Sequence, residues 1–196
     1  VSRVSLLPRV ADLNGDGRPD IVGERFPLGG QNYGQVVAYN PSLPGEETSS
    51  PFTLAWDSNQ TFLTQDAGDF DGDGRVDILG LALQEIRVYS PGPAGTYPTR
   101  LSWRSSEAWA SHFIPAATGA GLDIVAARDD ELRIYRREGA ELVVRQALEN
   151  PTPAQGINSI TPYIVSGVFE QGGPLALATI DGDGDLLVYR RGQDGD

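Results

Sequence analysis

Two nine-residue stretches of this chain carry acidic residues at the spacing of a metal-binding loop. The first runs from Asp12 to Asp20 and reads DLNGDGRPD, and the second runs from Asp69 to Asp77 and reads DFDGDGRVD. Oxygen-bearing side chains occupy positions 1, 3, 5 and 9 of each loop, and glycines at positions 4 and 6 let the backbone curl around a centre. Carboxylates held this close together repel each other, so a divalent cation would stabilise either loop.

Calcium is the cation that suits these donors, because it takes about six to eight oxygen ligands from carboxylates, amides and backbone carbonyls. The predicted ligands of the first site are the side chains of Asp12, Asn14, Asp16 and Asp20 and the carbonyl of Arg18. The predicted ligands of the second site are the side chains of Asp69, Asp71, Asp73 and Asp77 and the carbonyl of Arg75. The sequence therefore predicts two Ca²⁺ sites.

The alternative for each loop is a metal-free Asx-type turn between strands, since Asp, Asn and Gly are common turn residues. An EF-hand is excluded, because the bidentate glutamate needed at its twelfth position would fall on Gly23 and on Gly80. Both loops instead lead directly into β-prone segments, at Ile21–Val22 and at Ile78–Leu81. We therefore expect calcium in loops that connect strands.

The elements that must position these loops are four copies of a unit of about fifty residues. Each copy contains a short β-prone run that ends in tyrosine, at Val36–Tyr39, Ile86–Tyr89, Leu132–Tyr135 and Leu186–Tyr189. Other β-prone runs precede these, and no segment has a helical pattern. Four short antiparallel strands at this period are typical of β-propeller blades. We predict an all-β fold, a β-propeller of four-stranded antiparallel blades, with about four blades at residues 1–60, 61–107, 108–156 and 157–196.

Residues 12–22 and 69–79 resemble the FG-GAP/VCBS repeats of integrin-type β-propellers. The resemblance implies that the loop between the first and second strands of a blade binds calcium. It also implies a role in cell adhesion, as a lectin, or as an accessory domain of a large secreted protein. The later copies depart from the pattern: residues 115–123 keep only the last aspartate, Asp123, and residues 168–176 have none at positions 1, 5 and 9. We expect both of these loops to fold without calcium.

Three other features carry separate expectations. Asp181–Asp185 looks like a third calcium loop, but its place between two strands of the fourth copy favours a hairpin turn. Glu24–Gly34 lengthens the first copy and is either a binding loop or a neutral insertion. The fourth copy lacks an outer strand, which either Val1–Leu7 supplies in a closed four-bladed ring or other polypeptide supplies in a larger propeller. We favour the larger propeller, with Val1 as the start of a processed or trimmed piece.

Composition narrows the possible partners and the location. The formal charge of −12 argues against nucleic acid and anionic membrane surfaces, and no apolar stretch is long enough for membrane insertion. Calcium loops of this kind are saturated where free calcium is high, which favours an extracellular or periplasmic protein. Because the chain has no cysteine, we favour a secreted bacterial protein over a small disulfide-bonded one.

Candidate catalytic residues are few. His112 is the only histidine, and we expect it to be a packed or surface residue. Trp56 and Trp103 occupy matching strand positions, which favours packing between units over stacking on sugar rings. The predicted function is therefore a non-catalytic, calcium-stabilised interaction module for a protein or glycan partner. The alternatives are an accessory or catalytic propeller domain of a secreted polysaccharide-degrading enzyme, and a structural subunit of an extracellular assembly.

Overall fold

The computed structural model of the chain describes residues 3–4, 8–26, 35–41, 52–61, 63–82, 85–93, 96–106, 110–116, 121–127, 131–139, 141–149, 164–169, 171, 173–180 and 185–190. These residues form sixteen β-strands and no α-helix, which confirms the predicted all-β class for this part of the chain. Accordingly, the described residues contain no helix long and apolar enough to cross a membrane.

The strands form four sheets that follow one another along the chain, and all strand pairs are antiparallel. The first sheet contains β1 (Arg3–Val4), β2 (Arg9–Ala11), β3 (Asp20–Phe26), β4 (Gln35–Pro41) and β5 (Phe52–Thr61). The second contains β6 (Leu63–Gly68), β7 (Asp77–Ala82), β8 (Glu85–Pro91) and β9 (Pro98–Ser106). The third contains β10 (Ala110–Pro115), β11 (Leu122–Ala127), β12 (Glu131–Glu138) and β13 (Glu141–Glu149). The fourth contains β14 (Val165–Gly167), β15 (Ala176–Ile180) and β16 (Leu186–Arg190).

The repeat inferred from the tyrosines is present in the strand pairing. In every sheet the tyrosine pairs with an aliphatic residue of the preceding strand, as Tyr89 does with Ile78 and Tyr189 with Leu177. A β-bulge lies directly before this tyrosine in each of the first three sheets. Equal register and equal bulge position mean that residues at matching distances from the tyrosine occupy matching places in their sheets.

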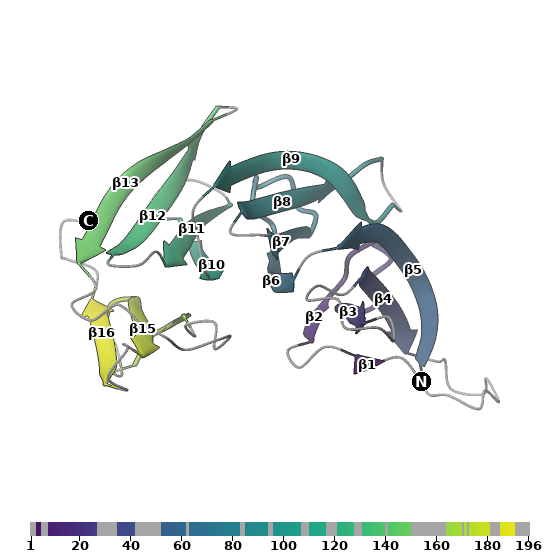
Figure 1. Cartoon of the computed structure of the whole chain (residues 1–196), viewed down its shortest axis with the longest axis horizontal. Coiled ribbons are helices and arrows are strands. Elements are labelled where there is room, and N and C mark those ends of the chain that lie inside the picture. Colours follow the sequence, from purple (N-terminus) through teal and green to yellow (C-terminus); the bar gives the residue numbers. More distant parts are fainter. Residues whose placement is uncertain are drawn as a thin grey trace.

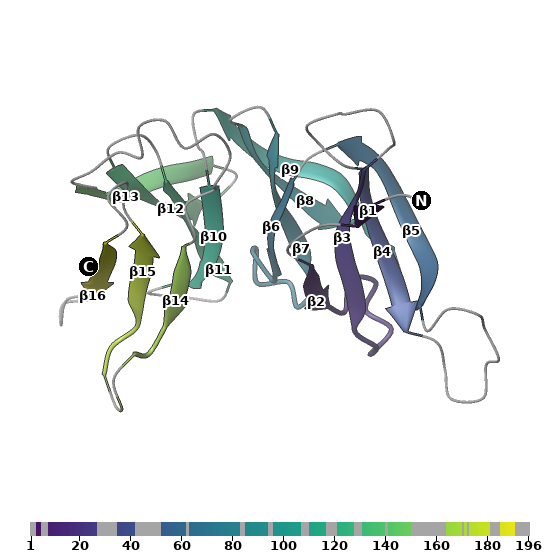
Figure 2. The same ribbon diagram turned by 60° about the horizontal axis from the view of Figure 1, so that its bottom comes forward.

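The four sheets lie along an arc, with the first and fourth sheets at its ends (Figure 1). A view turned by 60° shows the same succession of sheets along the chain (Figure 2). Within the described ranges the sheets do not close into a ring, since the core clusters join only consecutive sheets and the first and fourth sheets lie at opposite ends of the arc (Figure 1). Arg3 and Val4 of β1 pair with Phe26 and Arg25 of β3. The alternative in which Val1–Leu7 completes the fourth sheet is therefore wrong for these two residues.

Apolar cores lie between neighbouring sheets rather than within one of them. Side chains along a strand point alternately to opposite faces, so one sheet buries its two faces against two different neighbours. In β12, Tyr135 packs in the core shared with the second sheet, whereas Leu132 packs in the core shared with the fourth. Every residue of β7 is buried for the same reason. Trp103 of β9 also packs between sheets, with its ring centroid 6.0 Å from that of Tyr135.

Two predicted connections between strands, at Glu24–Gly34 and at Asp181–Asp185, lie only partly within the described residues. Glu24–Phe26 belong to strand β3, and the buried Glu24 carboxylate accepts a hydrogen bond from the amide of Thr64 in β6. The interpretation of this segment as a loop is therefore wrong for its first three residues, and residues 27–34 lie outside the described part. Residues 181–184 and the side chain of Trp56 also lie outside it. Strands β15 and β16 nevertheless pair as a hairpin requires, up to Ile180 and Leu186.

Candidate metal centre

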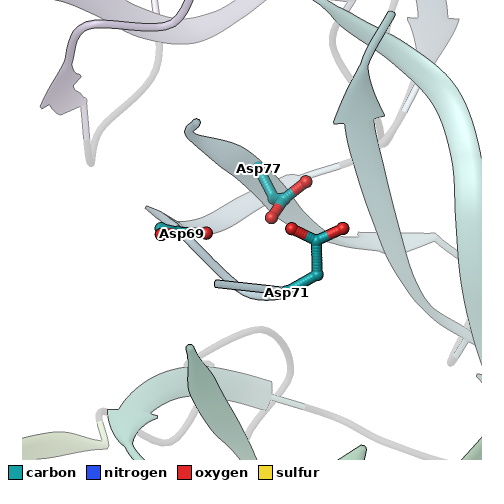
Figure 3. A group of neighbouring side chains, drawn as sticks. All are labelled: Asp69, Asp71 and Asp77. Atoms are coloured by element: carbon teal, nitrogen blue, oxygen red, sulfur yellow. The ribbon is translucent and has the colours of Figure 1, made fainter. Parts of the chain in front are cut away.

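The second acidic loop connects β6 and β7 and brings three carboxylates together. Asp69 and Asp71 lie in the loop, and Asp77 is the first residue of β7. One carboxylate oxygen of each lies within 4.8 Å of those of the other two (Figure 3). This group could hold a metal ion, although the arrangement by itself does not select calcium over other hard cations.

Backbone amides of the loop itself hold the carboxylates in place. Asp69 accepts hydrogen bonds from the amides of Gly72 (2.8 Å) and Gly74 (3.0 Å), and Asp77 accepts one from Phe70 (2.8 Å). Gly72 and Gly74 have φ angles of +76° and +84°, which L-residues with a Cβ rarely adopt. The glycines at positions 4 and 6 thus turn the loop amides towards the acidic side chains.

Asp77 is the buried member of the group, with an exposed fraction of 1%. The pKa of its carboxyl group is raised to about 6, mainly by burial and also by the charges of Asp71 and Asp73, although hydrogen bonds with Ser90 and the Phe70 amide lower it. The ionised form of Asp77 is therefore disfavoured by its surroundings. A cation bound between Asp69, Asp71 and Asp77 would remove this penalty.

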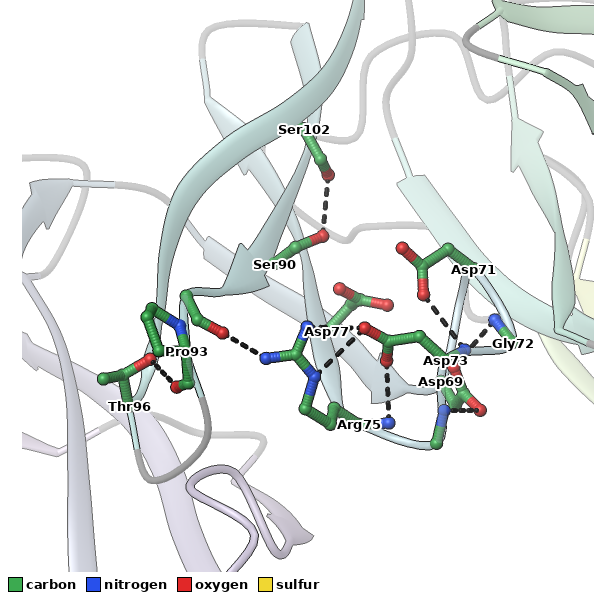
Figure 4. Close-up of polar contacts among 12 residues, drawn as sticks. Asp69, Asp71, Gly72, Asp73, Arg75, Asp77, Ser90, Pro93, Thr96 and Ser102 are labelled. Carbon is green, nitrogen blue, oxygen red and sulfur yellow. Dashed lines mark hydrogen bonds and ion pairs between the residues drawn. The ribbon is translucent and has the colours of Figure 1, made fainter.

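The fourth predicted side-chain ligand of this site, Asp73, is oriented differently. Its Oδ2 atom accepts hydrogen bonds from Nη2 (2.6 Å) and Nε (3.0 Å) of Arg75, whose Nη1 also donates to the carbonyl of Gly92 (Figure 4). The Arg75 side chain accordingly lowers the pKa of the Asp73 carboxyl group. The structure therefore pairs Asp73 with Arg75 and does not place it in the group formed by the other three aspartates.

The first acidic loop connects β2 and β3 and has a similar pattern of hydrogen bonds from backbone amides to carboxylates. Asp12 accepts hydrogen bonds from the amides of Asp16 (3.0 Å) and Gly17 (2.8 Å), and Asp20 accepts one from Leu13 (2.9 Å). The bonds from Gly17 and Leu13 match those from Gly74 and Phe70 in the second loop, whereas the remaining bond comes from the fifth loop position instead of the fourth. The local sequence has therefore produced the same turn twice, as the spacing predicted.

The side chains of the first loop do not gather around one point as those of Asp69, Asp71 and Asp77 do in the second loop. Asn14 donates through Nδ2 to Asp16 Oδ2 (3.1 Å), and Asp16 Oδ1 accepts from the amide of Arg18 (2.8 Å). Asn14 Nδ2 also lies 3.4 Å from the Tyr97 hydroxyl oxygen, in the connection between β8 and β9. Among the residues that the structure describes, only the second loop gathers three acidic side chains at ligand distance.

Asp20 is the residue of the first loop that fits a cation best. Its side chain is fully buried, and its Oδ1 atom has no hydrogen-bond partner among the described residues. Burial raises the pKa of its carboxyl group, and the charges of Asp16 and Asp12 raise it further. Because a buried acceptor without a partner costs about 1–3 kcal/mol, a cation at Oδ1 would stabilise the folded chain.

Each acidic loop is fixed to the following sheet by the apolar residue at its second position. Leu13 packs with residues of the second sheet, and Phe70 packs with residues of the third. The amide of Leu122 donates to the carbonyl of Phe70 (3.2 Å). Gly121 has a φ of +96°, and a Cβ there would lie 2.6 Å from the same carbonyl oxygen. The loops therefore lie where neighbouring sheets meet, which the ligand spacing did not reveal.

The third sheet supplies a positive charge of its own at the matching position. Asp123 corresponds to Asp77 and is 1% exposed. Arg136 donates to it from Nη2 (2.9 Å to Oδ2) and approaches it through Nε (3.3 Å to each oxygen). The sequence analysis did not predict this pair. Arg136 directly follows Tyr135, and the matching residue after Tyr89 in the second sheet is Ser90. In the fourth sheet the matching residue is Ala176, which needs no cation.

A row of polar contacts, also missed in the sequence, joins the first strands of the sheets. Arg9 of β2 donates to the Gln65 carbonyl and lies 3.7 Å from Asp66. Asp66 Oδ2 lies 2.6 Å from His112 Nδ1, and His112 Nε2 lies 3.4 Å from Ser166 Oγ. Burial alone would raise the pKa of Asp66, but the His112 ring and nearby backbone amides lower it overall. The half-buried His112 thus contacts both neighbouring sheets.

Comparisons with known proteins add no family. No family model matches the chain, and no curated protein matches it. The similarity to FG-GAP/VCBS repeats therefore stays a prediction that depends on the two loops and the strand pattern.

Proposed function

We propose that this chain is a calcium-stabilised β-propeller module, or a segment of one, that acts outside the cytoplasm as a non-catalytic interaction domain. The observation that supports this most directly is the group of Asp69, Asp71 and Asp77, held by loop amides around a buried carboxylate. These hard oxygen donors suit Ca²⁺ better than softer transition metals. The buried Asp20 supports a second, similar site in the first loop.

The function of such ions would be to fix the sheets relative to one another. Each acidic loop places its second residue, Leu13 or Phe70, in the core shared with the following sheet. A cation would supply only charge neutralisation and coordination for the carboxylates. The loop residues themselves would then hold the contact between sheets, and the stacked sheets would present a rigid surface to a protein or glycan partner. A calcium requirement would support an extracellular location, where free calcium is high.

Chelation combined with thermal unfolding tests this proposal. Metal that binds only the folded chain stabilises it by about 2.7 kcal/mol at a hundredfold excess over Kd. We therefore expect calcium to raise Tm clearly and excess chelator to lower it, with two ions bound per chain in calorimetry. An unchanged Tm in excess chelator would contradict the proposal. A glycan-array screen with the calcium-loaded chain would then separate a glycan partner from a protein partner.

A second candidate function, hydrolysis through an acyl-enzyme, is favoured by the order of Asp66, His112 and Ser166. Their 2.6 Å and 3.4 Å contacts follow the acid, base and nucleophile arrangement of serine hydrolases, with the longer contact on the nucleophile side. A fluorophosphonate probe tests it, because the probe reacts only with an activated serine. Labelling that is lost in Ser166→Ala and kept in Ser102→Ala would support hydrolysis. An unlabelled wild-type chain would contradict it.

A further inference from the structure

The fourth sheet has an apolar face that no other described part of the chain covers. We call it the outer face of the fourth sheet and define it by Val165, Phe169, Leu186 and Val188, whose exposed fractions are 49%, 52%, 68% and 45%. Leu187 and Tyr189 alternate with two of these residues along β16 and are less exposed. Tyr189 packs in the core shared with the third sheet, so the outer face points away from that sheet.

Matching positions in the other sheets are buried against the next sheet along the chain. Leu186 and Val188 stand three residues and one residue before Tyr189. The residues at these distances before the tyrosines of β8 and β12 are Ile86, Val88, Leu132 and Ile134. The first three of them have an exposed fraction of 0%, and each of the four packs in the core shared with the following sheet.

The other two residues of the outer face follow the same rule. Phe169 stands at the second position of the fourth loop, where Leu13 and Phe70 are 1% and 5% exposed because the next sheet covers them. Val165 of β14 pairs with Ala178 at the register where His112 pairs with Val125. His112 contacts the following sheet through Ser166. All four positions are therefore contact positions between sheets.

The first sheet has the complementary exposed residue at the opposite end of the arc. Val10 of β2 is 67% exposed and pairs with Ile21. The matching residue of the third sheet is Phe113, which pairs with Ile124 and is 5% exposed in the core shared with the second sheet. Val10 therefore marks the face that a preceding sheet covers elsewhere in the molecule.

We propose that the outer face of the fourth sheet binds the Val10 face of the first sheet in a second copy of this chain. The contact continues the interface already present between consecutive sheets, and both of its halves occur in one chain. A head-to-tail contact of this kind is heterologous, and it closes when rotation returns to the starting copy. The first and fourth sheets lie at the two ends of an arc that is open on one side (Figure 1), and a closed dimer would contain this contact twice.

Sedimentation velocity of the full chain in calcium buffer tests this contact. We expect a reversible dimer, with Leu186→Glu and Val10→Glu each raising the dissociation constant at least about tenfold, because each places a charge in an apolar contact. The matched control is Leu101→Glu on β9, since Leu101 is 45% exposed but lies outside both faces. Circular dichroism of each variant would verify folding, which exposed positions should tolerate.

Mixing the two variants separates a head-to-tail contact from a symmetric one. Each variant keeps one intact face, so an equimolar mixture restores one contact between an intact fourth sheet and an intact first sheet. Association of the mixture above that of either variant alone would support the proposal. A monomeric wild-type chain, or a dimer that neither substitution weakens, would overturn it. The measurement is independent of the partner named in the proposed function.

Discussion

Asp77 and Asp123 occupy the same position in neighbouring sheets, but the charges around their side chains differ. Asp77 is the first residue of β7 and Asp123 is the second residue of β11, and each is 1% exposed. Asp77 lies among other carboxylates, and its pKa is raised to about 6, mainly by burial. Asp123 instead faces the Arg136 guanidinium at 2.9 Å. The second acidic loop gathers negative charge around the buried carboxylate, whereas in the third sheet the side chain of Arg136 in β12 neutralises it.

The difference indicates what this position requires. A carboxylate buried between sheets is unfavourable unless a positive charge accompanies it. The third sheet meets the requirement with Arg136, and the proposed cation would meet it in the second loop. Residues 115–123 lack the other loop aspartates, and there Arg136 supplies the positive charge that we propose a cation supplies in the second loop. Four predictions test this comparison.

Removal of Arg136 should have the largest effect. Arg136→Ala leaves Asp123 buried without a positive partner, and we expect the free energy of unfolding to fall by about 3 kcal/mol. The loss should be equal in calcium and in chelator, as measured by urea unfolding. Arg104→Ala is the control, because the Arg104 side chain is 67% exposed and its Nε lies 3.7 Å from Glu85. Rescue of Arg136→Ala by calcium would contradict the comparison.

The same substitution at the two aspartates should give different results. Asp77→Asn should abolish the calcium-dependent stabilisation of its site, worth about 2.7 kcal/mol at a hundredfold excess of calcium, and should not lower stability in chelator, because the neutral amide removes the disfavoured buried charge. Asp123→Asn should lower stability equally in both buffers, because it weakens only the pair with Arg136. Urea unfolding of both variants with and without calcium measures this. An equal calcium response in the two variants would show that the loops do not differ in this way.

The two acidic loops should differ in affinity by a smaller amount. The second loop has one more carboxylate than the first and gathers three of them, so we expect it to bind calcium roughly tenfold more tightly. Calorimetry on Asp12→Asn, which leaves the second site, and on Asp69→Asn, which leaves the first, compares the two. Equal affinities, or a further site at Asp181, would contradict this ranking.

Arg75→Ala should have the smallest effect. The Arg75 pair with Asp73 is exposed, so we expect no measurable change in stability. The substitution keeps the backbone carbonyl, frees Asp73 and removes a positive charge beside the site. Calcium affinity of the second loop should therefore rise about twofold at low ionic strength. A fall in affinity would show that the Arg75 side chain supports the loop.

The sequence alone was sufficient for the features that depend on near neighbours in the chain. Alternating apolar residues and the recurring tyrosines predicted β4, β8, β12 and β16, and the absence of helix among the described residues agrees with that pattern. The glycines at positions 4 and 6 predicted the tight turns of both acidic loops, and Gly15, Gly17, Gly72 and Gly74 all have positive φ angles. These features follow from backbone geometry within a few residues, which the local sequence fixes.

Only the tertiary structure decided which charges meet. Spacing placed Asp73 among the ligands of the second site, whereas the structure pairs Asp73 with Arg75 and gathers the other three aspartates at ligand distance. Arg136 meets Asp123 because β12 pairs with β11, and Asp66 meets His112 because β6 lies beside β10. Contacts of this kind depend on strand register and on how sheets stack, so residues far apart in the chain become partners. The sequence thus determined where carboxylates would gather, and the packing of the sheets decided how each one is neutralised.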